Sequence, residues 1–168
     1  MMDETTKEIV SGIEMVFFDF DGVFTDNMVI VWEDGTEGVR CNRSDGMGLL
    51  MLKETGIKIM VISTESNPVV SRRCEKLGIP CIQDCSDKIT AMKKVLGKNG
   101  ISLEQTAFMG NDVNDVECMK QAGLPVAVAD AYPVAMKHAL YITEKPGGHG
   151  AVRELCDLLI SHRRSQNG

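Results

Sequence analysis

The residues with the clearest capacity for chemistry lie in the stretch FFDFDGVFTDN, residues 17–27. An apolar run typical of a buried strand leads directly into Asp19, Asp21 and Asp26. Carboxylates this close repel one another and resist burial, so this placement is unfavourable unless a cation or a chemical role offsets it. Because side chains two apart on an extended segment point the same way, Asp19 and Asp21 are expected to share one pocket.

Three further polar segments follow or flank apolar runs later in the chain. They are Ser63-Thr64-Glu65, Lys88 at the start of a helical pattern, and GNDVND at residues 110–115. Each alone is most often turn or cap chemistry. In a parallel sheet, however, ligands bind beyond the carboxyl ends of the strands, so together these segments would meet on one rim.

That set of residues suits phosphoryl transfer. Two carboxylates and an oxygen from the 110–115 loop would hold Mg²⁺, a hard ion that prefers oxygen ligands. One carboxylate could attack phosphorus and form an aspartyl-phosphate. Lys88 and the Ser63 hydroxyl would then hold the phosphoryl oxygens.

The elements that must position these groups alternate along the chain. Strands are expected at residues 13–18, 58–62, 80–83, 106–109, 126–129 and 141–143. Helices are expected at residues 45–54, 67–78, 87–96, 112–121, 133–138 and 151–162, followed by a frayed tail at 163–168. A hairpin at 28–32 and 37–41 surrounds the turn pair Asp34-Gly35. The alternation predicts an α/β fold with a largely parallel central sheet covered on both faces, in one domain spanning 1–168.

Composition narrows the class further. The 168 residues carry a net charge of -6 with 43% hydrophobic residues, which disfavours a broad nucleic-acid surface. No apolar run reaches the ~20 residues of a membrane helix, and the polar N-terminus has no signal-peptide core, which indicates a cytoplasmic protein. Six cysteines without a C-x-x-C pair are expected to be reduced thiols rather than zinc ligands or disulfides.

These four segments resemble the motifs of the haloacid dehalogenase (HAD) superfamily of phosphatases. DFDGVFT at 19–25 is similar to its first motif, Ser63 to the second, Lys88 to the third and 110–115 to the fourth. The resemblance implies Asp19 as nucleophile and Asp21 as general acid and base, with Asp21 binding metal through its main-chain carbonyl. Asn111 stands where the family usually has Asp, so either Asn111 or Asp112 is expected to be the third ligand to Mg²⁺.

The resemblance is closest to phosphatases of 2-keto-3-deoxy sugar-acid phosphates. The shared stretches are DGVFTDN, NRSDGMG, GNDVND, AVADA and PGGHGAVRE. Only the hairpin at 28–41 occupies the place of a cap domain. In capless relatives such hairpins pack together, so a homotetramer with sites near subunit interfaces is expected.

The substrate expected from this resemblance is a small anionic sugar phosphate. Glu65 is typical of the nine-carbon, sialic-acid-type group and could accept hydrogen bonds from hydroxyls, while Arg73 and Lys76 could pair with the sugar carboxylate. These three favour a nine-carbon 9-phosphate, with the eight-carbon octulosonate 8-phosphate as the alternative. A non-catalytic oligomerisation domain is the alternative of another class. The residues expected to bind substrate are Thr25, Ser44, Asp45, Thr64, Glu65, Arg73, Lys76 and Asn114.

Overall fold

A parallel sheet of six strands forms the centre of the protein. The computed structural model describes residues 3–166, and the strand order is β5-β4-β1-β6-β7-β8, with every neighbouring pair parallel. The predicted α/β class is thereby confirmed. The strands are β1 (Met15–Phe18), β4 (Lys58–Ile62), β5 (Cys81–Ile82), β6 (Thr106–Gly110), β7 (Leu124–Ala127) and β8 (Tyr141–Ile142).

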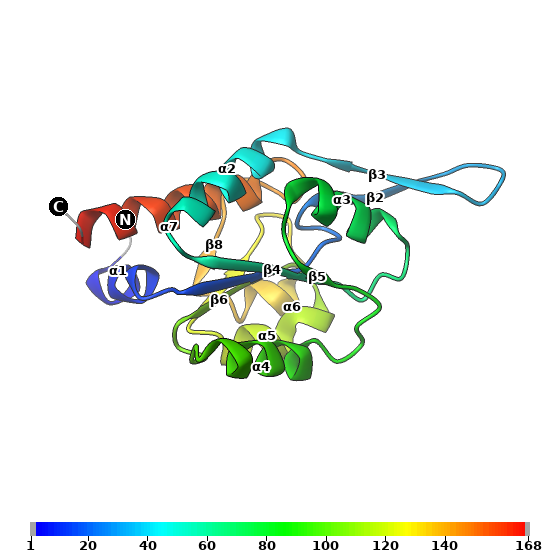
Figure 1. Ribbon diagram of the computed structural model, residues 1–168. Coiled ribbons are helices and arrows are strands. Elements are labelled where there is room, and N and C mark those ends of the chain that lie inside the picture. The colour runs from blue at the N-terminus through cyan, green and yellow to red at the C-terminus, as the bar shows by residue number, and fades with distance from the viewer. Residues whose placement is uncertain (1–2, 167–168) are drawn as a thin grey trace.

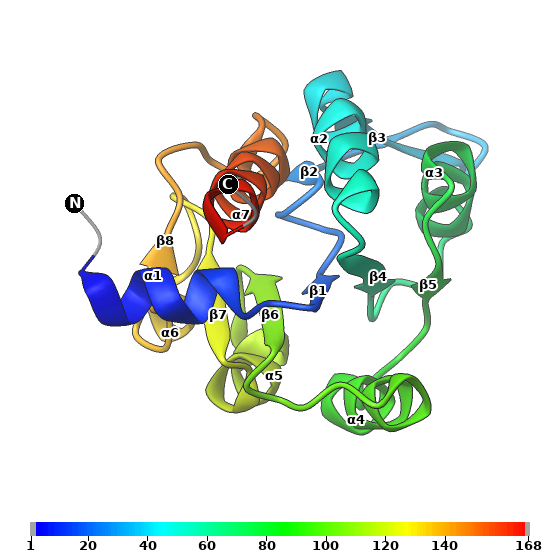
Figure 2. The ribbon, with the colours of Figure 1, turned by 60° about the vertical axis from the view of Figure 1, so that its left-hand side comes forward.

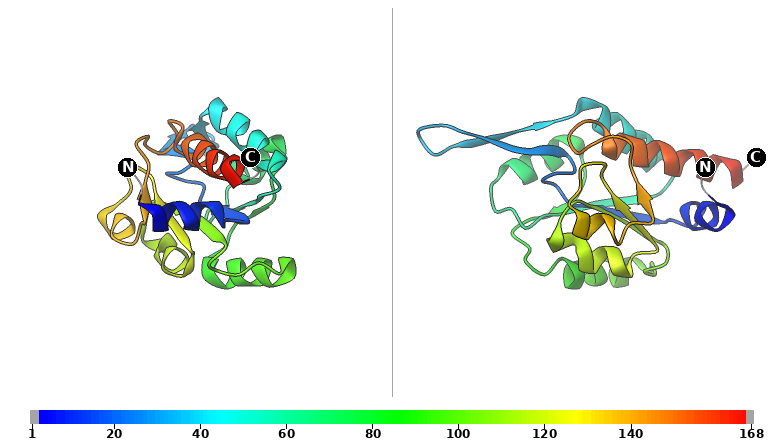
Figure 3. Two further views of the ribbon diagram at one scale, coloured as in Figure 1. Left: turned by 90° about the vertical axis from the view of Figure 1, so that its left-hand side faces the viewer. Right: turned by 180° about the vertical axis from the view of Figure 1, so that it is seen from behind.

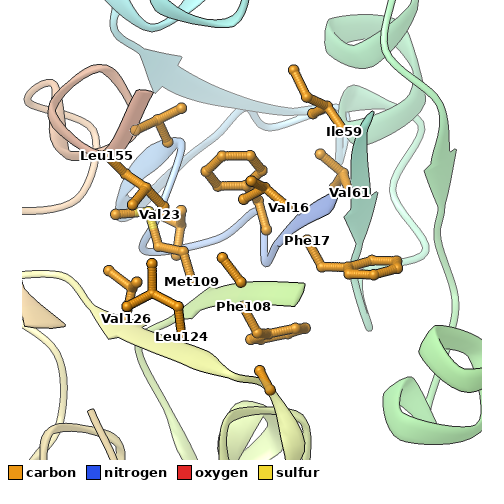
Figure 4. Close-up of a cluster of buried hydrophobic side chains, with 14 of the residues drawn as sticks. Val16, Phe17, Val23, Ile59, Val61, Phe108, Met109, Leu124, Val126 and Leu155 are labelled. Carbon is orange, nitrogen blue, oxygen red and sulfur yellow. The ribbon is translucent and has the colours of Figure 1, made fainter. Parts of the chain in front are cut away.

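Helices cover both faces of this sheet (Figures 1 and 2). One face carries α2 (Arg43–Glu54), α3 (Val69–Leu77) and α7 (Ala151–Gln166), and the other carries α4 (Lys88–Asn99), α5 (Val116–Gln121) and α6 (Pro133–Met136). The four residues of β1 are fully buried, as expected for a strand covered on both sides. Figure 4 shows the resulting core, in which Leu155 of α7 and Val23 lie in the same cluster as the strand side chains.

Several element boundaries differ from those expected. The N-terminal segment forms a helix, α1 (Glu4–Ser11), because Asp3 accepts a hydrogen bond from the Thr6 amide and Val10 is buried in the core. The helix expected at 112–121 begins instead as a 3-10 turn, Val113–Asp115, before α5. The last helix continues beyond the predicted end at residue 162 to Gln166, and the final two residues of the expected frayed tail lie outside the described residues.

The hairpin of β2 (Thr25–Val31) and β3 (Glu37–Cys41) extends away from the body of the protein (Figures 1 and 3). Between β1 and β4 the chain contains only this hairpin and α2. The outer part of the hairpin exposes large apolar side chains, so it contributes little to the core of its own chain. These residues are Met28, Val29, Ile30, Val31 and Trp32. No helix within residues 3–166 is both long and apolar enough to cross a membrane.

Candidate active site

Asp19 lies at the carboxyl end of β1 and is almost completely buried. Its amide donates to Met109 O at 2.9 Å, which fixes the residue between β1 and β6. Its Oδ1 accepts from the Phe20 amide at 2.7 Å and lies 2.7 Å from Lys88 Nζ. Lys88 Nζ also lies 2.8 Å from Asp115 Oδ1, and all three charged side chains are at most 6% exposed. One buried lysine therefore serves two buried carboxylates.

This arrangement leaves the buried site with one negative charge more than Lys88 can balance. Burial, and then the charge of Asp115, raises the pKa of Asp19 above its ordinary value. Burial alone would lower the pKa of Lys88, but Asp19 and Asp115 together raise it, so Lys88 remains charged. An additional cation beside Asp19 would compensate the excess charge.

Asn111 directly follows β6, and its side chain lies against Asp19 and Asp21 in the loop that follows β1, residues 19–24. In the structure the Asn111 amide oxygen faces only acceptors, and with the amide turned over its nitrogen would donate to Asp21 O at 3.0 Å and Asp19 Oδ2 at 3.3 Å. As placed, three oxygens converge: Asp19 Oδ2, the Asp21 carbonyl and Asn111 Oδ1. Three such oxygens suit a hard divalent cation such as Mg²⁺.

Within residues 3–166, no three His, Cys, Asp or Glu side chains are arranged to hold a metal ion. The three converging oxygens differ from such a cluster because they include a main-chain carbonyl and a side-chain amide. Only one of the three converging oxygens belongs to a carboxylate. Asp112 Oδ1 instead accepts from the Val113 amide at 2.6 Å as a helix cap. Of the two ligands left open by the sequence, the geometry therefore favours Asn111 over Asp112.

The glycine-rich segment at residues 146–150 packs against the backbone of the loop after β1. Gly148 N donates to Val23 O at 3.0 Å, and Gly147 N donates to Asp130 Oδ1 at 2.8 Å. A Cβ on Gly147 would lie 2.0 Å from Gly22 O, so only glycine permits this approach. Gly22 in turn has φ +78°, and a Cβ there would lie 2.0 Å from the Asn111 amide nitrogen. The conformation of the loop thus depends on close backbone packing.

A cavity of about 370 Å³ opens beside Asp21, between the hairpin and the segment that follows β4. Glu37 and Val39 of β3 form one wall, while Thr64 and Glu65 form another. Burial, followed by the charge of Glu65, raises the pKa of Asp21. A raised pKa favours the protonated carboxyl that a general acid needs. The cavity therefore adjoins Asp21, a group able to transfer a proton that lies two residues after the buried Asp19.

Comparison with known proteins places this geometry in a family. A sequence profile described as haloacid dehalogenase-like hydrolase matches residues 78–155. The 3-deoxy-D-manno-octulosonate 8-phosphate phosphatase of Escherichia coli K12 is 38% identical over 150 residues, covering 89% of this chain and 80% of that protein. The chain belongs to the haloacid dehalogenase-like hydrolases. The prediction of a phosphatase of this superfamily is confirmed.

Solved structures agree closely with this hydrolase fold. The octulosonate 8-phosphate phosphatase of Yersinia pestis is 33% identical with a TM-score of 0.94, covering 99% of this chain and 91% of that one. The corresponding phosphatase of Moraxella catarrhalis, solved with magnesium ion, phosphate ion and 3-deoxy-D-manno-octulosonate (KDO), is 33% identical with a TM-score of 0.93. That match covers 99% of this chain and 96% of the other.

The other residues predicted from the sequence of this hydrolase fall into two groups. Ser63, Thr64 and Glu65 follow β4, and Thr64 and Glu65 line the cavity. Ser63 is buried outside the cavity lining, and its Oγ accepts from the Glu65 amide at 3.1 Å. The rest do not line the cavity: Thr25 is fully buried, with Oγ1 accepting from the Gly22 and Asn27 amides, and Asn114 is exposed.

Ser44, Asp45, Arg73 and Lys76 also lie away from the cavity of this hydrolase. Asp45 is fully buried, and its Oδ1 accepts from the Arg153 amide at 3.1 Å at the start of α7. Ser44 Oγ donates to Asn42 Oδ1, Arg73 Nη2 donates to Asn42 O at 3.4 Å, and Lys76 is exposed. Within this chain, the structure does not bring Glu65 together with Arg73 and Lys76.

Asp115 belongs to the predicted 110–115 motif, but the sequence assigns it no individual role, whereas the structure makes it the second acidic partner of Lys88. Its Oδ2 accepts from the Asn111 amide at 2.9 Å and the Asp112 amide at 3.3 Å. It thereby fixes the loop that presents the Asn111 side chain. The spacing Asp112-x-x-Asp115 could have indicated a capping pair, but only the fold places Asp115 beside Lys88.

Proposed function

We propose that this protein hydrolyses 3-deoxy-D-manno-octulosonate 8-phosphate with Mg²⁺ as its metal. The observation that carries the proposal is the buried Asp19 carboxylate, which Lys88 holds at 2.7 Å and which faces the Asp21 carbonyl and the Asn111 amide. The substrate is suggested by the Escherichia coli relative and by the Moraxella catarrhalis phosphatase solved with KDO.

In this mechanism the Asp19 carboxylate attacks phosphorus, and the bond to the sugar oxygen breaks. Asp21 gives its proton to the departing sugar hydroxyl and then takes a proton from the water that hydrolyses the aspartyl-phosphate. Lys88 and Ser63 hold phosphoryl oxygens while Asp115 keeps Lys88 in position. When bound by Asp19, the Asp21 carbonyl and Asn111, Mg²⁺ supplies positive charge that offsets the charge of the phosphoryl group.

Two alternatives from the sequence are weaker. The nine-carbon preference depended on Glu65, Arg73 and Lys76 acting together, and Arg73 and Lys76 do not line the cavity that contains Glu65. None of the relatives described above carries a nine-carbon substrate in its name. A purely oligomerising role does not require Lys88 to be buried between two carboxylates. Burying these three charges costs desolvation free energy, which indicates that they have a function.

Assembly and location form part of the proposal. Exposed apolar side chains on the hairpin, such as Val31 at 61% and Trp32 at 51%, suit packing against other copies of the chain in a homotetramer. The six cysteines are all free thiols, which suits the reducing cytoplasm.

The experiment that tests the function is phosphate release with and without Mg²⁺. The eight-carbon 8-phosphate is compared at matched concentrations with nine-carbon 9-phosphates, with and without the amino group. We expect the eight-carbon substrate to have the highest kcat/KM and Asp19→Asn to lower kcat by at least ~100-fold without loss of helical signal. Preference for a nine-carbon substrate would refute the proposed substrate, and no turnover of any of them would favour the oligomerisation role.

A further inference from the structure

Three carboxylates lie around the cavity beside the reacting group. Asp21, Glu37 and Glu65 all line this cavity. The ion pairs formed within the described part of the chain involve none of the three. Lys88, which is buried, is already held by Asp19 and Asp115. These three side chains therefore offer the cavity hydrogen-bond acceptors that carry negative charge.

Asn67 fixes two of these carboxylates relative to each other. Its main-chain amide donates to Glu65 Oε1 at 2.8 Å, and its side-chain Nδ2 donates to Glu37 Oε2 at 3.2 Å. Its Oδ1 accepts from the Val69 amide at 3.1 Å, so the amide orientation is set by the start of α3. The described residues donate no hydrogen bond to Glu37 Oε1 or Glu65 Oε2, which leaves one oxygen of each for a ligand.

We propose that Glu37, positioned by Asn67, determines specificity by accepting hydrogen bonds from substrate hydroxyl groups adjacent to the phosphate. The inference extends the proposed function by assigning these acceptors to the hydroxyl-bearing part of the sugar. A hydroxyl is a donor that a carboxylate accepts strongly, whereas a second carboxylate on the ligand would be repelled. The substrate carboxylate therefore points away from Glu37 and Glu65.

The position of Glu37 on β3 makes the hairpin part of substrate recognition within its own chain. Glu37 lies 30 residues from Asn67 in the sequence, and their hydrogen bond joins the hairpin to the segment before α3. Met28, Val29 and Val39 of the same hairpin give the cavity an apolar side against which carbon atoms of a sugar can pack. A combination of polar acceptors and apolar contacts is typical of sites for small hydroxylated ligands.

The test variant is Glu37→Gln, because Asn67 Nδ2 would then donate to the glutamine oxygen and leave an amide donor facing the ligand. Three phosphates serve as probes: the octulosonate 8-phosphate, D-arabinose 5-phosphate, and ethyl phosphate, which has no hydroxyl group. All three release a primary alcohol, so their demand for a general acid is similar. Glu33→Gln is the matched control, since it removes the same charge from the turn of the same hairpin outside the cavity.

We expect Glu37→Gln to lower kcat/KM about 10-fold or more for both hydroxylated phosphates and less than about 2-fold for ethyl phosphate. Glu33→Gln should leave all three values unchanged. Asn67→Asp, which keeps the acceptor for Val69 but loses the donor to Glu37, should reproduce the selective loss. Equal losses on all three probes, or no loss on any, would overturn the assignment.

Failure of the proposed function gives a different result. In that case the wild-type protein would hydrolyse arabinose 5-phosphate as well as or better than the octulosonate 8-phosphate. The effect of Glu37→Gln would then still be measured on arabinose 5-phosphate against ethyl phosphate. A preference for another phosphate thus overturns the octulosonate substrate alone, whereas no turnover of any probe would overturn both the proposed function and the assignment of Glu37.

Discussion

Asp45 provides a sharp test of the electrostatics of this fold. Asp45 lies in the first turn of α2, where its side chain is fully buried against the start of α7, and Oδ2 has no hydrogen-bond partner among residues 3–166. Burial raises the pKa of Asp45 to about 6, against an ordinary value of 3.8. Because the folded state holds the proton more tightly than the unfolded chain, ionisation of Asp45 destabilises the folded protein as the pH rises from about 4 to 6.

The magnitude follows from the two pKa values. Each pH unit between them corresponds to about 1.4 kcal/mol, so the ionised carboxylate lowers the free energy of unfolding by about 3 kcal/mol above pH 6. In Asp45→Asn this pH-dependent contribution is absent, while the amide oxygen can still accept from Arg153 N. Any constant cost of burying the amide NH₂ group, about 1–3 kcal/mol, is the same at every pH.

The assay is denaturant unfolding of both proteins at equal concentration, followed by far-ultraviolet circular dichroism between about pH 4 and 7.5. We expect the stability of Asp45→Asn relative to wild type to increase by about 3 kcal/mol over this range. Asp157→Asn is the control, because this more exposed carboxylate pairs with Arg153 on the same helix and should change stability by no more than about 1 kcal/mol. A difference that is constant with pH, or that shifts in favour of wild type as pH rises, would refute the reasoning.

Three further substitutions test the site and the assembly. Lys88→Met should lower kcat by at least ~100-fold and destabilise the fold by about 3–5 kcal/mol, because Asp19 and Asp115 lose their only ion-pair partner in residues 3–166; near-normal phosphate release would contradict this. Gly147→Ala should lower kcat at least ~10-fold, because the added Cβ would displace Gly22. Gly97→Ala on α4, where the added Cβ meets no atom, should instead raise the free energy of unfolding by about 0.5–1 kcal/mol. Equal effects of the two substitutions in activity and unfolding assays would contradict the role given to the loop. Val31→Lys should yield a smaller assembly in sedimentation, and an unchanged mass would exclude packing through the exposed hairpin.

The sequence was sufficient to predict the central strands, most of the helices, and the edge of the sheet at which the site lies. Apolar runs such as 58–62 identified the central strands, and polar residues after each run located the ligand-binding edge, because a parallel sheet places its carboxyl ends together. The sequence did not reveal α1, whose short amphipathic pattern is stabilised by burying Val10 and by the Asp3 cap.

Pairing among the polar residues depended on the tertiary structure. Composition and spacing could not show that Lys88 lies between Asp19 and Asp115, because these contacts join segments 27 and 69 residues from Lys88 in the chain. Composition and spacing also could not show whether Asn111 or Asp112 is placed to bind the metal ion. That depends on which of the two side chains the loop before the 3-10 turn directs toward Asp21.

What the sequence by itself determined was the kind of chemistry: carboxylates, a hydroxyl, a lysine and an amide, each following or flanking a strand. What only the tertiary structure decided was which groups act together. Asp45, expected at the substrate, is buried as a helix cap, whereas Glu37 and Asn67, which no motif indicated, face the cavity. The physical reason is that residue type sets what a group can do, but burial and distance set its charge state and its partners.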